Sequence, residues 1–214
     1  MTVELLSFEE FMPPFAKSEK NILQGVNYAP GASGILDETG SLMGARVPMS
    51  IQIRNHKTII ARIRKIIRND SSTEKLLRQC IYSIQIGSND FVNNYFKPNF
   101  YNSSHGYSLS EFATMLVRQF AHQIKDLYKI GARIFALFGL GQLGCTPNAI
   151  ATHGTNGSLC PCSNRKQYAF WDGVHPTDAS NVLIAKNLYG TRSFSDARPF
   201  NIQSLARKSS DDLI

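Results

Sequence analysis

Hydrophobic residues recur at helical spacing in three stretches of the chain. Residues 57–68 place Ile59, Ile60, Ile63, Ile66 and Ile67 on one helical face, and the basic side chains lie mostly elsewhere. Residues 112–128 carry a second apolar stripe behind the capping-box pattern Ser-Leu-Ser-Glu at 108–111, with Gly131 where a helix-ending glycine belongs. A third helix is expected to start at Thr177-Asp-Ala-Ser and to carry an apolar stripe of Val182, Leu183, Ala185 and Leu188.

The pattern of two other apolar segments predicts strands. Residues 81–86 are followed by the polar turn Gly-Ser-Asn-Asp at 87–90, and residues 133–138 run into a glycine-rich segment. The order strand, helix, strand forms a βαβ unit, which predicts an α/β fold with a parallel sheet. Residues 11–50 are rich in Gly and Pro and are expected to form loops with short elements.

Charge and composition narrow the class of protein. The 214 residues are 43% hydrophobic and 18% charged, so the chain is neither a disordered tail nor a coiled coil, and no apolar run approaches the ~20 residues of a membrane span. The net charge of +7 is compatible with an anionic partner. The basic segment 54–68 could bind nucleic acid, but no aromatic platform accompanies it, so we expect a core-facing helix with a solvated basic side and no nucleic-acid partner.

The stretch between Phe138 and Tyr168 contains no periodic segment. A structureless loop of ~30 residues is uncommon inside a compact α/β domain, so either the loop is functional or a segment is absent. The glycines at 139, 141 and 144 match G-x-G-x-x-G, but Cys-Thr-Pro follows where a helix should open. They are better explained as turn glycines, and no cofactor is expected.

Polar residues beside these elements could carry chemistry. The Asn89 amide, in the turn after the first strand, can donate to an oxyanion. Asp172 stands three residues before His175 and could fix the tautomer of a general base. Each pattern alone is also typical of an ordinary surface turn.

The cysteines predict no metal site, because Cys145, Cys160 and Cys162 lack a fourth ligand at recognisable spacing. A Cys145–Cys160 disulfide would close a loop of about 15 residues, worth ~3 kcal/mol in an oxidising compartment. Cys80 is most simply a buried thiol.

Four stretches, taken in order, resemble the plant GDSL esterase/lipase family, a branch of the SGNH hydrolases. They are residues 22–35, 82–96, 139–148, and 162–165 together with 168–177. The resemblance implies a three-layer α/β/α fold with a mostly parallel sheet and hydrolysis of carboxylic esters, with a small-molecule or lipid ester as substrate. By position, Gly31 and Asn89 resemble the oxyanion-hole residues, His175 the general base and Asp172 its orienting acid.

The chain also departs from the family pattern. It contains no Gly-Asp-Ser, the triplet that carries the family's nucleophilic serine, and no G-x-S-x-G. The first block and its central strand are expected to be absent, as is a segment near 160/161, so residues 1–214 would form one partial, incomplete domain. Ser33 and Ser88 lie beside the oxyanion residues, on the wrong side to replace the nucleophile. We therefore expect no turnover; the alternative is a non-catalytic acyl-ester or lipid-binding protein.

The family resemblance implies secretion. The first residues, however, include acid and lack the apolar stretch of a signal peptide, which predicts an intracellular protein if Met1 is the true start.

Overall fold

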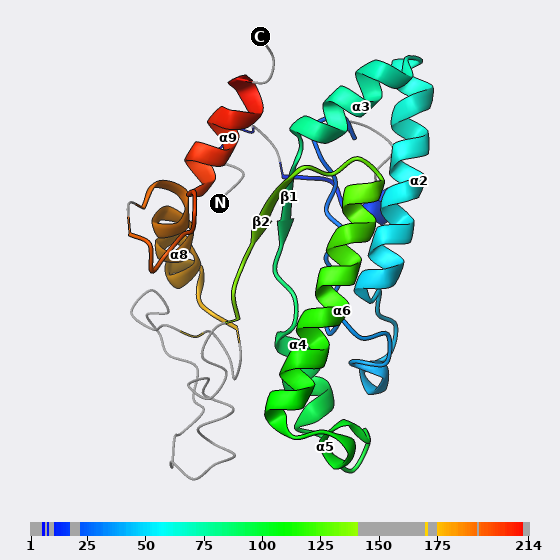
Figure 1. The fold of residues 1–214 in the computed structure, drawn as a ribbon, viewed down its shortest axis with the longest axis vertical. Helices are drawn as coiled ribbons and strands as arrows, with labels where there is room; N and C mark the ends of the chain where they lie inside the picture. Colours follow the sequence, from blue (N-terminus) through cyan, green and yellow to red (C-terminus); the bar gives the residue numbers. More distant parts are fainter. Residues whose placement is uncertain are drawn as a thin grey trace. The chain divides into compact units, whose positions relative to one another are not determined.

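The computed structural model describes residues 6, 8, 11–17, 22–140, 170, 175–191 and 193–211. The chain divides into two compact units. One comprises Met12–Leu140, and the other comprises Met1–Phe11 with Gly141–Ile214. Each unit is described by itself below (Figure 1).

Within the described residues, the unit of residues 12–140 contains the two strands and most of the helices. In chain order its elements are η1 (Phe15–Lys17), η2 (Ser41–Met43), α2 (Met49–Ile67), α3 (Asp70–Gln79), β1 (Ile81–Ile84), α4 (Ser88–Asp90), the π-helical η3 (Phe91–Tyr95), α5 (Ser103–Gly106), α6 (Leu109–Lys129) and β2 (Ile134–Leu137).

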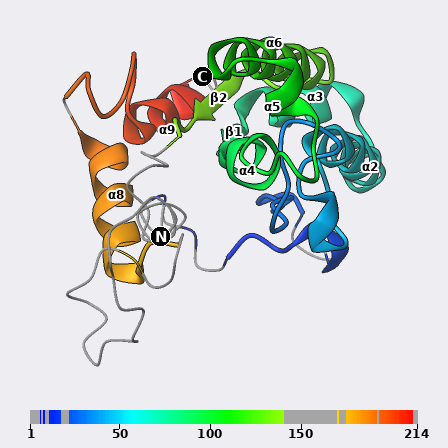
Figure 2. The same cartoon turned by 90° about the horizontal axis from the view of Figure 1, so that it is seen from below.

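Strands β1 and β2 form a parallel pair, in register from Ile81 opposite Ile134 to Ile84 opposite Leu137. The connection between them contains α6, so the predicted βαβ unit and the α/β class are confirmed. Helices α2 and α6 pack beside the strands (Figure 1), where Met49, Ile53 and Leu127 form a buried cluster with the strand side chains. The segment after the carboxyl end of β1 lies next to the loop that precedes α2 (Figure 2), and hydrogen bonds of Asn89 and Asp90 join the two.

Helix α2 begins at Met49, eight residues before the predicted stretch. Its buried side chains continue the isoleucine stripe backwards through His56 and Ile53 to Met49. The pattern hides this extension because polar residues at 54–56 interrupt the apolar run. Ile66 was expected on the buried face but is 53% exposed, so the buried stripe ends before the last turn of the helix.

Helix α3 was not predicted. Its N-cap is Asn69, whose side chain accepts a hydrogen bond from the main-chain N–H of Ser72 at 2.8 Å. Thr73 and Leu77 are its buried residues. Asn69 before Asp-Ser-Ser was a usable signal, because an Asn at this position caps the first turn of a helix.

The predicted capping box at the start of helix α6 is confirmed. The Ser108 hydroxyl accepts from the N–H of Glu111, and the Glu111 carboxylate accepts from the N–H of Ser108 at 2.8 Å. Gly131 follows with φ of +118°, the left-handed region that favours glycine. Tyr128, predicted in the buried stripe, is 53% exposed. The Arg133 guanidinium, 3.9 Å from the ring centroid, covers one face of its ring.

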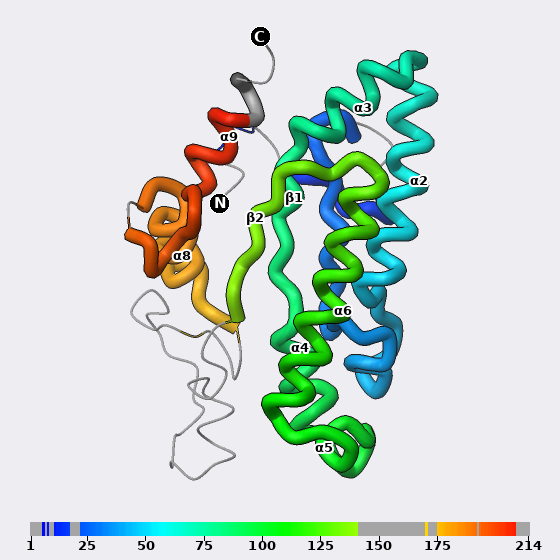
Figure 3. The backbone as a smooth tube through the Cα atoms, in the orientation of Figure 1, coloured from blue at the N-terminus to red at the C-terminus, as the bar shows by residue number. Residues whose placement is uncertain are grey.

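The second unit contains α8 (Asp178–Gly190) and α9 (Ile202–Asp211), which contact each other and are traced in orange and red in Figure 3. The predicted start of α8 is confirmed: the Thr177 hydroxyl accepts from the N–H of Ser180 at 3.2 Å. Ala185 is buried, whereas Leu183 of the expected stripe is 64% exposed. None of the helices in the described ranges is long and apolar enough to cross a membrane.

Candidate active site

The side chain of Asn89 joins the turn after β1 to the loop at residues 31–33. Its Nδ2 donates to the main-chain oxygen of Ser33 at 2.9 Å, and its Oδ1 accepts from Nδ2 of Asn93 at 2.8 Å. A primary amide has two N–H donors, so one remains for a ligand. Asn89 is half-buried, which keeps that donor within reach of a ligand.

Gly31 lies on the same loop and is exposed. A Cβ built at this position would meet no atom within 4 Å, so the space beside Gly31 is open. No acceptor among the described residues takes its N–H. The next residue, Ala32, has φ of +58°, a left-handed conformation that turns the chain sharply here. The two predicted oxyanion residues thus belong to adjoining segments, and each has a donor available.

Asp90 fixes this arrangement and was missed by the sequence reasoning. Its carboxylate is fully buried and accepts from the N–H of Ile35 at 2.8 Å, the N–H of Leu36 at 3.0 Å and the hydroxyl of Thr39 at 2.7 Å. Burial raises the pKa of Asp90, and these hydrogen bonds oppose that rise. The only sequence signal was an acid directly after Asn89 in a strand-ending turn.

Further polar contacts hold the same loop. Gln123 of α6 donates from Nε2 to the main-chain oxygen of Ile35 at 2.9 Å. Asn94 is fully buried; its Nδ2 donates to the Thr39 hydroxyl at 3.2 Å, and its Oδ1 accepts from the Ser103 hydroxyl at 2.7 Å. The loop before α2 is therefore tied to three other segments, which gives its donors a fixed position.

The buried His56 of α2 contacts both β1 and the segment that precedes the Gly31 loop. His56 lies between the hydroxyls of Tyr28, 2.9 Å from Nδ1, and Tyr82, 3.2 Å from Nε2. Both rings contact the imidazole edge to face. Burial lowers the pKa of His56 to about 4 and raises the pKa of both tyrosines. Tyr28 precedes the Gly31 loop and Tyr82 lies in β1, so this contact positions both.

The two serines beside the site differ in their surroundings. Ser33 is buried; its hydroxyl accepts from the N–H of Val47 at 3.0 Å and donates to the main-chain oxygen of Gly31 at 3.4 Å. These bonds give it a structural role in the loop. Ser88 is half-buried at the start of α4.

Of the remaining predicted residues that the structure describes, His175 belongs to the second unit and Cys80 to the unit of residues 12–140. His175 is exposed and stands two residues before Thr177, the cap of α8. Asp172, Cys145 and Cys160 lie outside the described residues. Cys80 is a free, half-buried thiol whose pKa is raised by burial. In the described ranges, no group of three or more His, Cys, Asp or Glu side chains is arranged to hold a metal ion.

Amide donors held at the carboxyl end of a parallel strand are typical of α/β enzymes that stabilise an oxyanion. Comparison with known families makes this class specific. The chain belongs to the family of GDSL-like lipases and acylhydrolases, whose pattern matches residues 4–167.

Similar proteins are known from Arabidopsis thaliana. GDSL esterase/lipase At1g29660 is 32% identical over 281 aligned residues, which cover 95% of this chain and 77% of the relative. GDSL esterase/lipase At1g29670 is 32% identical with the same coverage, and GDSL esterase/lipase At5g45670 is 31% identical. The comparison with solved structures gives no match.

Proposed function

We propose that this chain is built to bind carboxylic esters of the lipid or acyl type, with Gly31 and Asn89 as the oxyanion hole and Asp172 and His175 as the orienting acid and general base. The observation that carries the proposal is the Asn89 contact to Ser33. It places an amide donor beside the exposed Gly31 loop and leaves one N–H of that amide for the ligand. Ester hydrolysis agrees with the family and with the names of the relatives.

Each residue of the proposed ester site has a distinct role. The N–H groups of Gly31 and Asn89 donate to the ester oxygen as it gains negative charge, which stabilises the tetrahedral state. His175 accepts the proton of an attacking hydroxyl, and Asp172 holds the imidazole in the tautomer that can do so. The buried carboxylate of Asp90 keeps the oxyanion loop in place through Ile35, Leu36 and Thr39.

We further propose that the 214-residue polypeptide does not turn esters over. It contains no Gly-Asp-Ser, and the hydroxyl of Ser33 is occupied by the loop. Without the nucleophile, a triad enzyme retains only binding and oxyanion stabilisation.

The alignment with At1g29660 spans 281 residues and covers 95% of this chain, so it includes positions of that relative that have no counterpart here. The absence of an internal segment near 160/161, which we propose, would account for such positions.

Hydrolysis of nitrophenyl butyrate, together with labelling by a fluorophosphonate, tests this proposal. We expect no turnover and no labelled serine in the unmodified chain. Labelling of one serine that disappears in His175→Ala would show that a nucleophile is present and would overturn the proposal. Turnover that survives His175→Ala would instead come from a contaminating esterase.

A non-catalytic acyl-ester or lipid-binding role is the alternative that the same site supports. The intact Asn89 donor favours it, because oxyanion donors bind a polarised ester even where no nucleophile attacks. Its test is saturable binding of nitrophenyl butyrate, measured by calorimetry, that weakens several-fold in Asn89→Ala. The exposed Asn102 gives the matched control Asn102→Ala, which should bind as the parent does.

The family resemblance also implies export, and with it an oxidising environment for the proposed Cys145–Cys160 disulfide. Thiol titration of the denatured chain, with and without reductant, tests the bridge. A bridged chain has two fewer reactive thiols before reduction than after it.

A further inference from the structure

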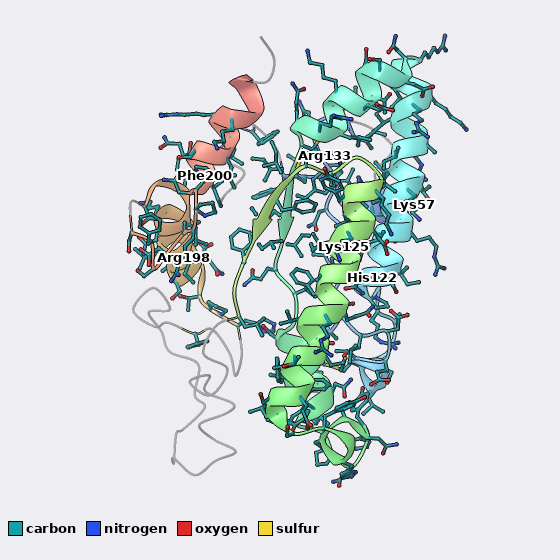
Figure 4. The ribbon with its side chains drawn as sticks, in the orientation of Figure 1. Lys57, His122, Lys125, Arg133, Arg198 and Phe200 are labelled. Carbon is teal, nitrogen blue, oxygen red and sulfur yellow. The ribbon has the colours of Figure 1, made fainter. Side chains whose placement is uncertain are left out.

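A cavity of about 530 Å³ opens where α2, α3 and the end of α6 meet, within residues 12–140. Figure 4 labels two of its side chains, Lys57 on α2 and Arg133 just before β2. Its volume lies in the range of small-molecule sites. The residues of the Asn89 site do not line it, so it is a separate feature of the fold.

The charged side chains that line the cavity are nearly all cationic. Five cations face a single carboxylate, and they come from four different segments of the chain. They are Lys57, Arg64, Arg78, Lys129 and Arg133, against Glu74. Buried apolar side chains, Ile60 and Leu77, line it as well. Arg133 is half-buried and the other four cations are exposed, so it is their summed charge that attracts an anion to this cavity.

Three of the cations already have partners that hold them in place. Nζ of Lys129 lies 2.9 Å from Oδ1 of Asp126, and Nε of Arg64 lies 3.6 Å from Oδ1 of Asp70. Arg133 donates from Nη1 to the main-chain oxygens of Tyr128 and Ala132, at 2.8 and 2.7 Å. Its guanidinium stacks on the ring of Tyr128. Arg133 is thus fixed in direction, and its Nε and Nη2 make no hydrogen bond to the described residues.

The other two cations, Lys57 and Arg78, form no side-chain hydrogen bond and have no carboxylate within 4 Å in the part of the chain that the structure describes, although the Asp126 carboxylate acts on Lys57 at longer range. They reach the same cavity from α2 and α3. A ligand that joined them to Arg133 would need several acceptor oxygens and more than one negative charge. Phosphate groups meet this need, because their oxygens accept from guanidinium pairs and from ammonium groups alike.

We propose that this cavity binds a small, multiply charged phosphate-bearing anion, held by Lys57, Arg78 and Arg133. The anion can be free in solution or can be the headgroup of a phosphate-bearing lipid. The chemistry at the cavity is the same for both sources. The inference does not depend on the proposed ester site, because no residue is shared between them.

Calorimetry with pyrophosphate tests the soluble source, and co-sedimentation with phosphatidylcholine vesicles, with and without phosphatidate, tests the lipid source. The test variant is the double change Lys57→Gln and Arg78→Gln. Arg54→Gln with Arg118→Gln is the matched control, since both are exposed cations on α2 and α6 that do not line the cavity. Circular dichroism confirms that each variant folds.

We expect saturable binding to at least one probe, roughly tenfold weaker in the cavity variant and unchanged in the control. Binding to pyrophosphate assigns a soluble ligand, and binding only to phosphatidate vesicles assigns a lipid headgroup. Equal weakening in the cavity and control variants would reduce the effect to net charge and overturn the proposal. Absence of binding to both probes would also overturn it.

Discussion

The buried carboxylate of Asp90 accepts a hydrogen bond from the main-chain N–H of Ile35 at 2.8 Å, although the two residues are 55 positions apart. This contact joins the turn that carries Asn89 to the loop that carries Gly31. The proposed oxyanion loop is therefore held in place by a residue to which we assign no direct contact with an ester.

Replacing Asp90 by Asn should destabilise the fold. The amide keeps the shape of the side chain but turns an N–H group towards donors that need an acceptor. Hydrogen bonds to a charged group contribute about 1.5–3 kcal/mol each, and a buried donor left unpaired costs about 1–3 kcal/mol. We expect the free energy of unfolding to fall by about 3 kcal/mol, measured by urea denaturation.

Asp70→Asn is the matched control for this change. The Asp70 side chain is 86% exposed and its pair with Arg64 is long, so the free energy of unfolding should hardly change. An Asp90→Asn protein as stable as this control would show that the loop is held by other contacts.

Gly34→Ala should also weaken the contact between the Asp90 carboxylate and the loop that precedes α2. A Cβ at Gly34 would lie 2.5 and 2.6 Å from the two Asp90 oxygens and 2.6 Å from a methyl carbon of Thr39. These neighbours are buried and cannot withdraw without breaking their mutual bond. Overpacking of this kind costs about 1–3 kcal/mol, visible as a lower melting temperature. Gly106→Ala, where an added Cβ meets nothing within 4 Å, should melt as the parent does.

His56 makes the stability depend on pH. Its pKa is lowered from 6.5 to about 4 in the folded chain, so the neutral imidazole is favoured by folding. Its stabilising contribution is complete above pH 6.5 and is lost as the pH falls through 4. The shift corresponds to about 3 kcal/mol. Urea denaturation at several pH values between 7 and 4 measures this loss.

The histidine variants separate this effect from other titrating groups. His56→Gln should lose less stability than the parent over that pH range, whereas the exposed His122→Gln should follow the parent. A folded-state NMR titration that gave His56 an ordinary pKa near 6.5 would contradict the assignment. That measurement uses the unmodified protein, so it holds even if His56→Gln does not fold.

The capping box of α6 provides a local prediction. Ser108→Ala removes the acceptor for the N–H of Glu111 and the hydroxyl that donates to its carboxylate. Loss of an N-cap costs about 1 kcal/mol. Thermal denaturation should show this decrease, while Ser110→Ala, two residues into the same turn, should have little effect. Equal melting temperatures for the two variants would mean that the cap is not needed.

The sequence predicted only part of the candidate site. Asn89 and Gly31 followed from the resemblance to the GDSL family, and the structure brings their segments together through Ser33. Asp90 and His56 were missed, because a buried polar side chain is recognised by its partners and those partners lie far away in the chain. The roles of His175 and Asp172 stay predictions.

The local elements follow directly from the order of the amino acids: the isoleucine helix, the capped helix α6, and two short strands joined in parallel. Hydrophobic period, caps and turn residues act within a few neighbouring positions, so they can be read from the chain directly. The three-dimensional packing, in contrast, sets which polar residues are buried, how far each apolar stripe is covered, and where cations from α2, α3 and α6 meet in one cavity. Burial and electrostatic environment depend on contacts between residues tens of positions apart, so no local pattern records them.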